Sequence, residues 1–300
     1  MTEPFAGLFS PFGADLSKPR GGRGKGIRLL TAISEIPPLG LGTFGRTGAE
    51  GAKDILAAIE IGYRHLDTAQ TYDSEDSVGA AIRDSGLPRS DFFVTTKVAD
   101  YNLGRSKFMP PVEKSLRTLN VGPVDLLLIH WPSFGGIVPF EHYIEALAEA
   151  QRRGHARSIG VSNFTIAHLM AAVRILGKGA LATNQVELNP FLQAPKLARY
   201  ARQIGLPLTA YLPIARGAVN HVPVISGIAA QHGCSNAAVA LAFLMAEGHV
   251  AIPASSRPER LRENFKALDI KFQPSEIEAF RKLDRSERVI GPDKSPEWDD

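Results

Sequence analysis

The sequence has very little cysteine and no long hydrophobic run. Cys234 is the one cysteine in 300 residues, which excludes an internal disulfide and a thiolate metal cluster. Residues 1–30 lack the apolar segment of a secretory signal, and no run of about 18 apolar residues occurs. No H-E-x-x-H or C-x-x-C motif is present, so no metal site is expected. These absences predict a cytoplasmic protein without a membrane-spanning segment.

Excess charge of one sign is confined to the N-terminus. Residues 1–28 hold five Lys or Arg against two acidic residues, whereas the remaining 272 residues carry 29 of each sign. A basic tail on a neutral body does not give the basic face that nucleic-acid binding needs. We therefore expect residues 1–28 to be a flexible basic extension and residues 29–300 to form one monomeric domain that binds a small molecule.

From residue 39 onward, a short apolar run alternates with a longer segment of helical periodicity. The apolar runs centre on Leu41, Leu66, Thr95, Leu127, Gly160, Gln185, Ala210 and Ile252. The helical patterns cover residues 52–61, 77–85, 111–119, 141–153, 166–175, 196–204, 222–232, 236–247, 260–268 and 275–283. Eight strand–helix units predict an α/β fold, a single (β/α)8 TIM barrel with its active site at the C-terminal rim.

A competing interpretation is a dinucleotide-binding Rossmann fold. Residues 40–45 match G-x-G-x-x-G, and Asp67 ends the next apolar run. A Rossmann helix starts within the glycine motif, whereas here residues 46–51 precede the helical pattern. Eight units instead of six also favour the barrel.

Four chemically active side chains are predicted to meet at one rim of the barrel. Asp67, Lys97 and His130 each end a predicted strand, and Tyr72 lies in the loop after Asp67. Parallel barrel strands present their C-terminal ends at the same rim. Taken singly, the Asp and Lys are equally well explained as an ordinary ion pair and the Tyr as a core cap. Four such residues on successive strands favour a functional site.

This set suits the protonation of an oxygen on which negative charge develops. Tyrosine has a reference pKa near 10, and we expect the Lys97 ammonium to lower the pKa of Tyr72. Asp67 is expected to pair with Lys97, and His130 to donate a hydrogen bond that orients a substrate carbonyl. Protonation is half of a carbonyl reduction, and the hydride must come from a cofactor.

Two other functions remain open on the same residues. Lys97 at a strand end is also suited to Schiff-base chemistry, as in barrel aldolases, which borohydride trapping would detect. A non-catalytic subunit that only senses a nicotinamide cofactor is the second alternative. The complete set of four residues argues against this alternative.

Several motifs resemble the aldo-keto reductase superfamily. They are Asp67-Thr68-Ala69-x-x-Tyr72, Lys97, Ile129-His130-Trp131-Pro132, Gly160-Val161-Ser162-Asn163-Phe164, Asn184-Gln185-Val186-Glu187, and Ile252-Pro253-Ala254-Ser255 with Arg260 and Glu263-Asn264. The resemblance extends from about residue 38 to the end. Within the family, residues 39–44, 128–133 and 295–299 are most similar to the bacterial 2,5-diketo-D-gluconate reductase B group.

The resemblance implies NADPH as hydride donor, Tyr72 as general acid tuned by Asp67 and Lys97, and His130 as the group that positions the carbonyl. It assigns the cofactor to Gly42, Thr43, Asp67, Ser162, Asn163, Gln185, Tyr211, Leu212, Ile214, Arg216, Ser255, Ser256, Arg257, Arg260, Glu263 and Asn264. Ser162, Asn163 and Gln185 would hold the carboxamide, and Tyr211 would stack on the nicotinamide. The implied substrate pocket consists of Phe44, Tyr72, His130 and Trp131.

Three positions differ from the commoner family pattern. Ala254 replaces a lysine that often contacts the 2′-phosphate, although Arg257 and Arg260 still offer positive charge. Leu212 replaces a frequent serine, and Arg216 replaces a small polar residue. Arg216 is hypothesised to meet the pyrophosphate, so Arg216→Ala would raise the cofactor Kd. Short loops after His130 and Tyr211 indicate an open mouth for small or polar carbonyls, such as 2,5-diketo-D-gluconate, methylglyoxal or β-keto esters.

Overall fold

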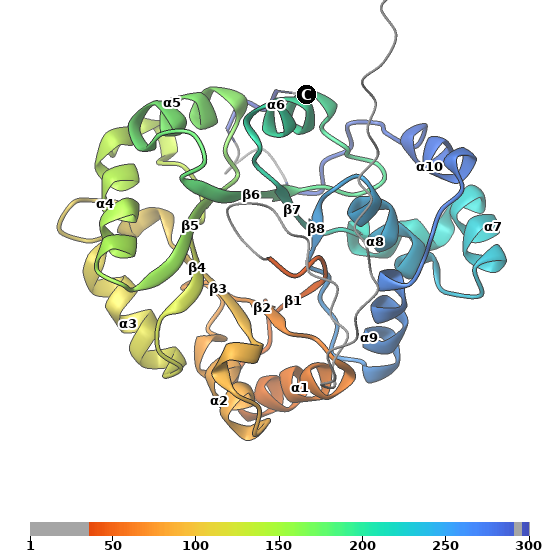
Figure 1. Ribbon diagram of the computed structural model, residues 1–300, viewed down its shortest axis with the longest axis horizontal. Helices are drawn as coiled ribbons and strands as arrows, with labels where there is room; N and C mark the ends of the chain where they lie inside the picture. The colour runs from red at the N-terminus through yellow and green to blue at the C-terminus, as the bar shows by residue number, and fades with distance from the viewer. Residues whose placement is uncertain (1–35, 291–295, 300) are drawn as a thin grey trace, which may run out of the picture.

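The computed structural model describes residues 36–290 and 296–299, and these residues form a parallel β-barrel. The strands pair in sequence order (Figure 1). They are β1 (Gly40–Gly42), β2 (His65–Asp67), β3 (Phe93–Val98), β4 (Val124–Ile129), β5 (Ala156–Ser162), β6 (Leu181–Glu187), β7 (Leu208–Tyr211) and β8 (Val250–Ala251). A parallel bridge between Leu39 and Ala251 joins the last strand to the first. The predicted (β/α)8 barrel is confirmed, whereas the predicted extension, residues 1–28, lies outside the described residues.

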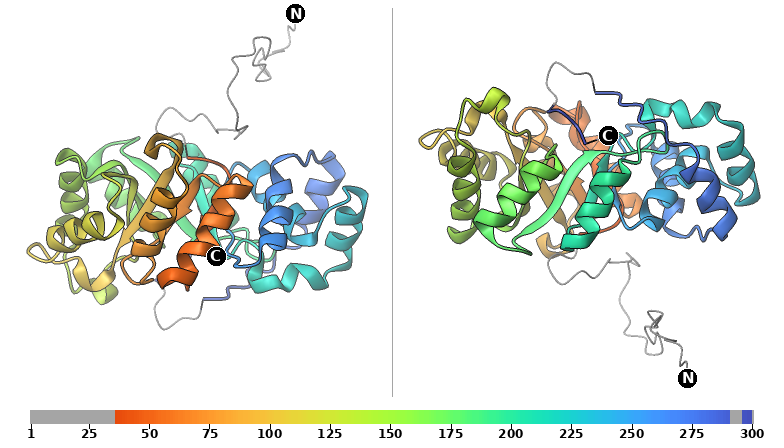
Figure 2. Two further views of the ribbon diagram at one scale, coloured as in Figure 1. Left: turned by 90° about the horizontal axis from the view of Figure 1, so that it is seen from below. Right: turned by 90° about the horizontal axis from the view of Figure 1, so that it is seen from above.

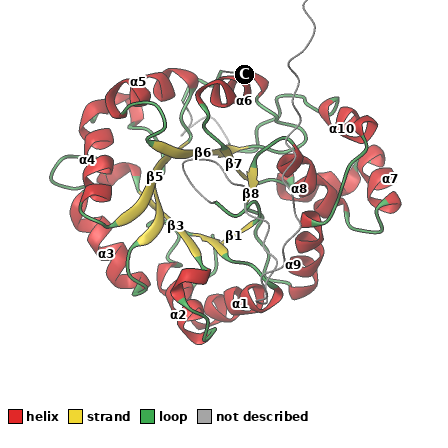
Figure 3. Cartoon of the chain, viewed as in Figure 1, coloured by secondary structure: helices red, strands yellow, loops and turns green. Residues whose placement is uncertain are grey.

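Helices surround the strands as an outer ring (Figure 3). They are α1 (Gly48–Ile61), α2 (Glu75–Asp84), α3 (Met109–Leu119), α4 (Phe140–Arg152), α5 (Ile166–Leu176), α6 (Pro195–Ile204), α7 (Pro223–Gln231), α8 (Asn236–Ala246), α9 (Pro258–Phe265) and α10 (Pro274–Arg281). Figure 2 shows the same ring from two sides, with the helices lying alongside the strands. The predicted helical segments all coincide with these helices, apart from differences of a few residues at their ends.

The predicted start of the first helix was wrong. α1 begins at Gly48 instead of residue 52, so the delayed start does not argue against a Rossmann fold. Two glycines within residues 48–51 lower the helix propensity of this turn, which hid it in the sequence. Gly51 is needed because a Cβ there would lie 2.2 Å from the carbonyl carbon of Arg46. The consecutive order of eight strands is what excludes the Rossmann topology.

The core has two parts, one on each side of the strands. Outside the barrel, apolar side chains of the strands pack against the helices. Inside it, a smaller apolar cluster is formed by Ile36, Leu126, Leu128, Ala182, Val250 and Ile252. Polar residues replace apolar ones toward the strand ends, where Asp67, Lys97 and Gln185 are all buried. The barrel therefore has an apolar interior and a polar upper layer, which carries the site.

Helix α8 is apolar on all sides because it is enclosed by the rest of the fold. Residues 238–244 are all buried, as expected for a helix without a polar face. Within the described ranges, no single helix is long and apolar enough to cross a membrane. Only α7 and α8 taken together pass such a test, and an 88° bend separates them.

Candidate active site

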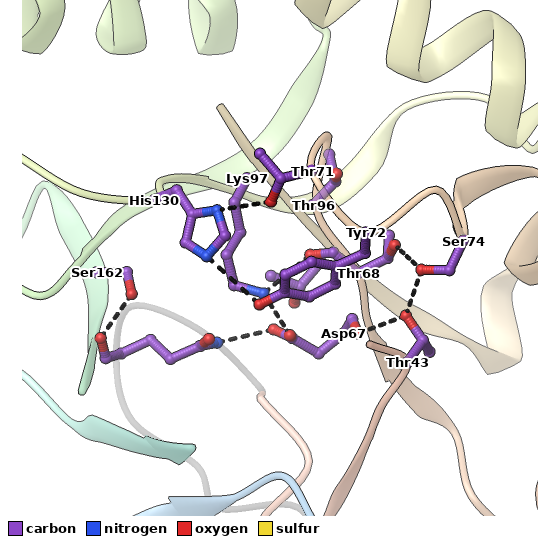
Figure 4. A network of polar contacts seen from close by, with 12 residues as sticks. Thr43, Asp67, Thr68, Thr71, Tyr72, Ser74, Thr96, Lys97, His130 and Ser162 are labelled. Carbon is purple, nitrogen blue, oxygen red and sulfur yellow. Dashed lines mark hydrogen bonds and ion pairs between the residues drawn. The ribbon is translucent and has the colours of Figure 1, made fainter. Parts of the chain in front are cut away.

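The structure brings the four predicted side chains together at the C-terminal rim (Figure 4). Lys97 Nζ donates to Asp67 Oδ1 and, at 2.9 Å, to the main-chain oxygen of Thr68. Tyr72 lies above this pair, with Lys97 Nζ 4.9 Å from its ring centroid. The Tyr72 hydroxyl and His130 Nε2 are 3.4 Å apart. β2, β3 and β4 are neighbours in the barrel, which is why Tyr72 and His130, 58 positions apart in sequence, come into contact.

The Asp67–Lys97 ion pair is buried, and both partners form further hydrogen bonds. The Lys97 side chain has no exposed surface, and Gln185 Nε2 donates to the second Asp67 oxygen at 2.7 Å. Burial lowers the pKa of Lys97, but the charge of Asp67, together with Tyr72 and hydrogen bonds, outweighs burial and raises it overall. Lys97 is therefore a fixed cation at neutral pH, held directly beneath the tyrosine.

The pKa of Tyr72 moves in the direction opposite to the sequence-based expectation. Burial raises it, the Lys97 charge lowers it and the Asp67 charge raises it, so the net shift is upward from 10. Lys97 does lower the pKa of Tyr72, as expected, but burial and the Asp67 charge together outweigh that effect. Tyr72 therefore keeps its proton at neutral pH and can act as a donor.

His130 is neutral in this environment. Burial and the Lys97 charge lower its pKa to about 3. Its Nδ1 lies 3.5 Å from Thr71 Oγ1, and its main-chain oxygen accepts a 2.9 Å hydrogen bond from Asn163 Nδ2. A neutral imidazole can orient a carbonyl through an N–H donor, but it has no extra proton to give. Tyr72 is thus the better proton source of the two.

The residues predicted to hold a carboxamide form one network across β5, β6 and β7. Ser162 Oγ donates to the Gln185 main-chain oxygen at 2.7 Å and accepts from Asn163 Nδ2 at 3.1 Å. The Tyr211 hydroxyl donates to Asn163 Oδ1 at 2.8 Å. Asn163 has a φ of 61°, a left-handed conformation that asparagine tolerates better than most residues. This conformation turns the chain at the end of β5, where the buried Asn163 amide links His130, Ser162 and Tyr211.

The remaining residues predicted for the cofactor lie in three segments around the rim. Thr43 follows Gly42 at the end of β1, and its hydroxyl donates to the Asp67 main-chain oxygen at 2.9 Å. Leu212, Ile214 and Arg216 follow β7. Leu212 and Arg216 have φ values of 49° and 52°, a strained conformation for non-glycine residues that often accompanies function. Neither residue type indicates this strain in the sequence.

The third segment is the start of α9. Ser255, Ser256 and the Arg257 N-cap precede the helix, and Arg260 lies in its first turn. Both arginines are exposed, and neither forms an ion pair with any described residue. In the same helix, Glu263 pairs with Lys266 and Asn264 is buried. The two arginines are therefore the members of this segment most available to an anion.

Three of the four residues predicted to form the substrate pocket are in ring contact with one another. Phe44, 69% exposed, packs edge-on against Tyr72 with ring centroids 5.2 Å apart, and Tyr72 packs similarly against His130 at 5.4 Å. Trp131 follows His130 and is half-buried, but within residues 36–290 no ring contact joins it to the other three.

One hydroxyl group that supports the site, that of Ser74, was not predicted from the sequence. Ser74 Oγ lies 3.0 Å from Thr43 Oγ1 and 2.9 Å from Thr68 Oγ1, and all three residues are completely buried (Figure 4). This chain of hydroxyls ties the β1 loop to the loop that carries Tyr72. Serine and threonine are common in loops, so Ser74 carried no signal, whereas Thr43 and Thr68 each lie in a motif that resembles the family.

The barrel and its buried Asp–Lys pair beneath a protonated tyrosine define a (β/α)8-barrel enzyme whose site can donate a proton to a carbonyl oxygen. The chain belongs to the Aldo/keto reductase family, whose model matches residues 38–285. It is an oxidoreductase of the carbonyl-reducing class, and its substrate is a small carbonyl compound.

Individual relatives agree with this assignment. The chain is 42% identical over 265 residues to methylglyoxal reductase DkgB of Escherichia coli O157:H7, covering 88% of this chain and 99% of the relative. It is 36% identical to an aldo-keto reductase of Mycolicibacterium smegmatis, covering 87% and 94%. A crystal structure with the provisional name 2,5-diketo-D-gluconic acid reductase B superposes with a TM-score of 0.85 at 40% identity, covering 89% and 95%.

Proposed function

We propose that the protein reduces small aldehydes and ketones to alcohols with NADPH, using Tyr72 as the proton donor. The observation that carries this proposal is the 3.4 Å approach of the protonated Tyr72 hydroxyl to the neutral His130 imidazole. Two hydrogen-bond donors converging on one point suit a carbonyl oxygen. The Asp67–Lys97 pair lies directly beneath that point.

The side chains divide the proton chemistry among them. NADPH, when bound, supplies the hydride that forms the new C–H bond. His130 holds the carbonyl oxygen, and Tyr72 transfers its phenolic proton to that oxygen as negative charge builds up. The product is the alcohol, and the phenolate left on Tyr72 is stabilised by the Lys97 ammonium, which lowers the Tyr72 pKa. Asp67 keeps Lys97 charged and in place through the step.

The residues around the rim fit a nicotinamide dinucleotide. Gln185 Oε1 accepts no hydrogen bond from the described residues, and the Tyr211 ring lies partly exposed beside Asn163. One amide oxygen left available on the same rim as an aromatic ring suits a carboxamide-bearing ring. Arg257 and Arg260 provide two guanidinium groups that form no ion pair with a described residue, at a helix start, where a phosphate is favoured.

The Schiff-base alternative fits the geometry poorly. A Schiff-base lysine needs a lowered pKa and access to the substrate. Lys97 has a raised pKa, and its side chain is completely buried in an ion pair. The absence of substrate trapped on the protein by borohydride would eliminate this alternative.

Cofactor choice is predicted to depend on the two arginines of the α9 start. In Arg257→Gln/Arg260→Gln, the Kd for NADPH should rise about tenfold to a hundredfold, since a hydrogen bond to a charged group is worth about 1.5–3 kcal/mol. The Kd for NADH, which lacks the 2′-phosphate, should change much less. Nicotinamide fluorescence titration measures both constants.

Arg262→Gln is the matched control, because Arg262 is exposed on the same helix but lies in its last turn. Equal losses of NADPH and NADH affinity in the double variant would contradict a role in 2′-phosphate recognition.

The proposed substrates are methylglyoxal and 2,5-diketo-D-gluconate, in keeping with the named relatives and the short rim loops. The test is consumption of reduced nicotinamide, followed by absorbance, with each carbonyl and with NADPH or NADH. Turnover with NADPH is the expected result. NADPH binding with no turnover on any carbonyl would favour the cofactor-sensing alternative, and no binding at all would overturn the proposal.

A further inference from the structure

A cavity of about 360 Å³ lies on the outer side of the barrel, between α6, α8 and α10. Figure 1 shows these helices on one side of the ring. None of the residues that line it belongs to the tetrad (Asp67, Tyr72, Lys97 and His130) or to the residues assigned to the cofactor. Its volume falls within the range of small-molecule pockets, roughly 300–1,000 Å³. The carbonyl-reduction chemistry makes no use of it.

The cavity carries an excess of available positive charge. Arg199 and Arg202 of α6 and Arg281 of α10 face two acids, Glu247 and Asp284. Glu247 is taken by Arg281 in a 2.8 Å ion pair. Asp284 Oδ1 accepts main-chain N–H groups of residues 193 and 286, at 3.1 and 3.3 Å. Arg199 and Arg202 have no ion pair with any described residue, so two guanidinium groups are left for an anion.

A buried histidine lies beside these arginines. His249 is 91% buried and lines the cavity, and its ring forms no hydrogen bond with the described part of the chain. Burial and the Arg202 charge lower its pKa to about 4, so it is neutral at pH 7 and close to Arg202. Its ring nitrogens remain open to water in the cavity. A bound acceptor can therefore reach them.

The other lining residues are largely apolar. The rest of the surface is formed by Leu188, Pro195, Ala198, Phe243 and Leu244, together with the polar Gln193. A site with convergent donors at one place and an apolar lining elsewhere is typical of pockets that bind small organic molecules. A lone inorganic anion would leave this apolar surface unused.

We propose that this cavity, which we call the α6–α8–α10 cleft, binds a small phosphorylated metabolite whose phosphate is held by Arg199, Arg202 and His249. A phosphate monoester dianion matches two guanidinium forks and one imidazole N–H, whereas a single carboxylate is satisfied by one fork. The organic part of the ligand rests against Phe243 and Leu244. The site is independent of the proposed reductase function.

The test follows the His249 imidazole by NMR while glucose 6-phosphate is added to the full-length protein saturated with NADP⁺. His249→Asn identifies the signal. Glucose 6-phosphate should shift it saturably and raise the His249 pKa, because a bound anion offsets the charges of Arg199, Arg202 and Arg281. In Arg199→Gln/Arg202→Gln the Kd should rise tenfold or more. No saturable shift of His249 in the wild-type protein would overturn the proposal.

Three comparisons sharpen the result. Lys178→Gln/Lys196→Gln removes the same charge from exposed positions outside the cleft and should leave the Kd unchanged. An equal loss in both double variants would show a non-specific charge effect and overturn the site. Glucose should not shift the NMR signal of His249, and gluconate should bind more weakly than glucose 6-phosphate. Gluconate binding as tight as the ester would overturn the assignment to a phosphate.

Discussion

Replacing Tyr72 with phenylalanine is expected to lower kcat for carbonyl reduction roughly 10²- to 10⁴-fold, the usual contribution of a positioned general acid. The ring remains, so its edge contact with Phe44 and its packing over Lys97 survive. Only the hydroxyl that faces His130 is lost. Cofactor Kd and the free energy of unfolding should therefore change little. Steady-state kinetics and a cofactor titration on the same preparation separate these effects.

Tyr101→Phe is the matched control, because Tyr101 lies in the loop after β3 and is 65% exposed. It loses the same hydroxyl and should retain wild-type kcat.

The pH profile adds a second criterion. Burial raises the pKa of Tyr72, so the wild-type rate should stay level through neutral pH and fall only under alkaline conditions, as Tyr72 loses its proton. Undiminished turnover in Tyr72→Phe would remove Tyr72 from the mechanism.

The second large effect concerns the buried ion pair. Lys97→Met leaves the Asp67 carboxylate buried, with Gln185 as its only side-chain partner among the described residues. Breaking one side of a buried pair costs about 3–5 kcal/mol, so the free energy of unfolding should fall by about that amount and turnover should disappear. Asp67→Asn/Lys97→Met removes both charges and should recover much of the stability without recovering activity. Urea unfolding and turnover assays on the variants measure the two effects.

Arg89→Met supplies the comparison for stability. Arg89 precedes β3 and forms a 2.6 Å ion pair with the buried Asp125 of β4. This pair lies outside the site. Its loss should destabilise the protein while leaving kcat of the folded enzyme unchanged. If Asp67→Asn/Lys97→Met were fully active, the ion pair would have a purely structural role.

The sequence was sufficient to predict the fold because every unit of a (β/α)8 barrel repeats the same short pattern. β4 has six buried residues and α4 a clear helical period, so each was located to within a few residues. α1 was placed late because its first turn depends on Gly51 meeting the backbone of Arg46. That contact depends on packing in three dimensions, so the helix propensity of the local sequence does not predict it.

The site was predictable in position but less so in its energetics. Topology alone places Asp67, Lys97 and His130 at a common rim, so their convergence followed from strand order. The pKa of Tyr72 depends on the balance of burial against two opposed charges, which is a three-dimensional property. The role of Ser74 and the α6–α8–α10 cleft also depend on contacts between residues far apart in sequence.

One hydrogen-bonded chain gives the mouth of the barrel a thermodynamic property. It connects Asn163 through Ser162 to the Gln185 backbone, and the Gln185 side chain to Asp67. A molecule that contacts Asn163 or Gln185 therefore acts on the carboxylate that sets the charge state of Lys97. Coupling between two binding equilibria is reciprocal. If binding of such a molecule raises the proton affinity of the tetrad, protonation of the tetrad must strengthen the binding of that molecule by the same free energy. The affinity for the molecule must then depend on pH.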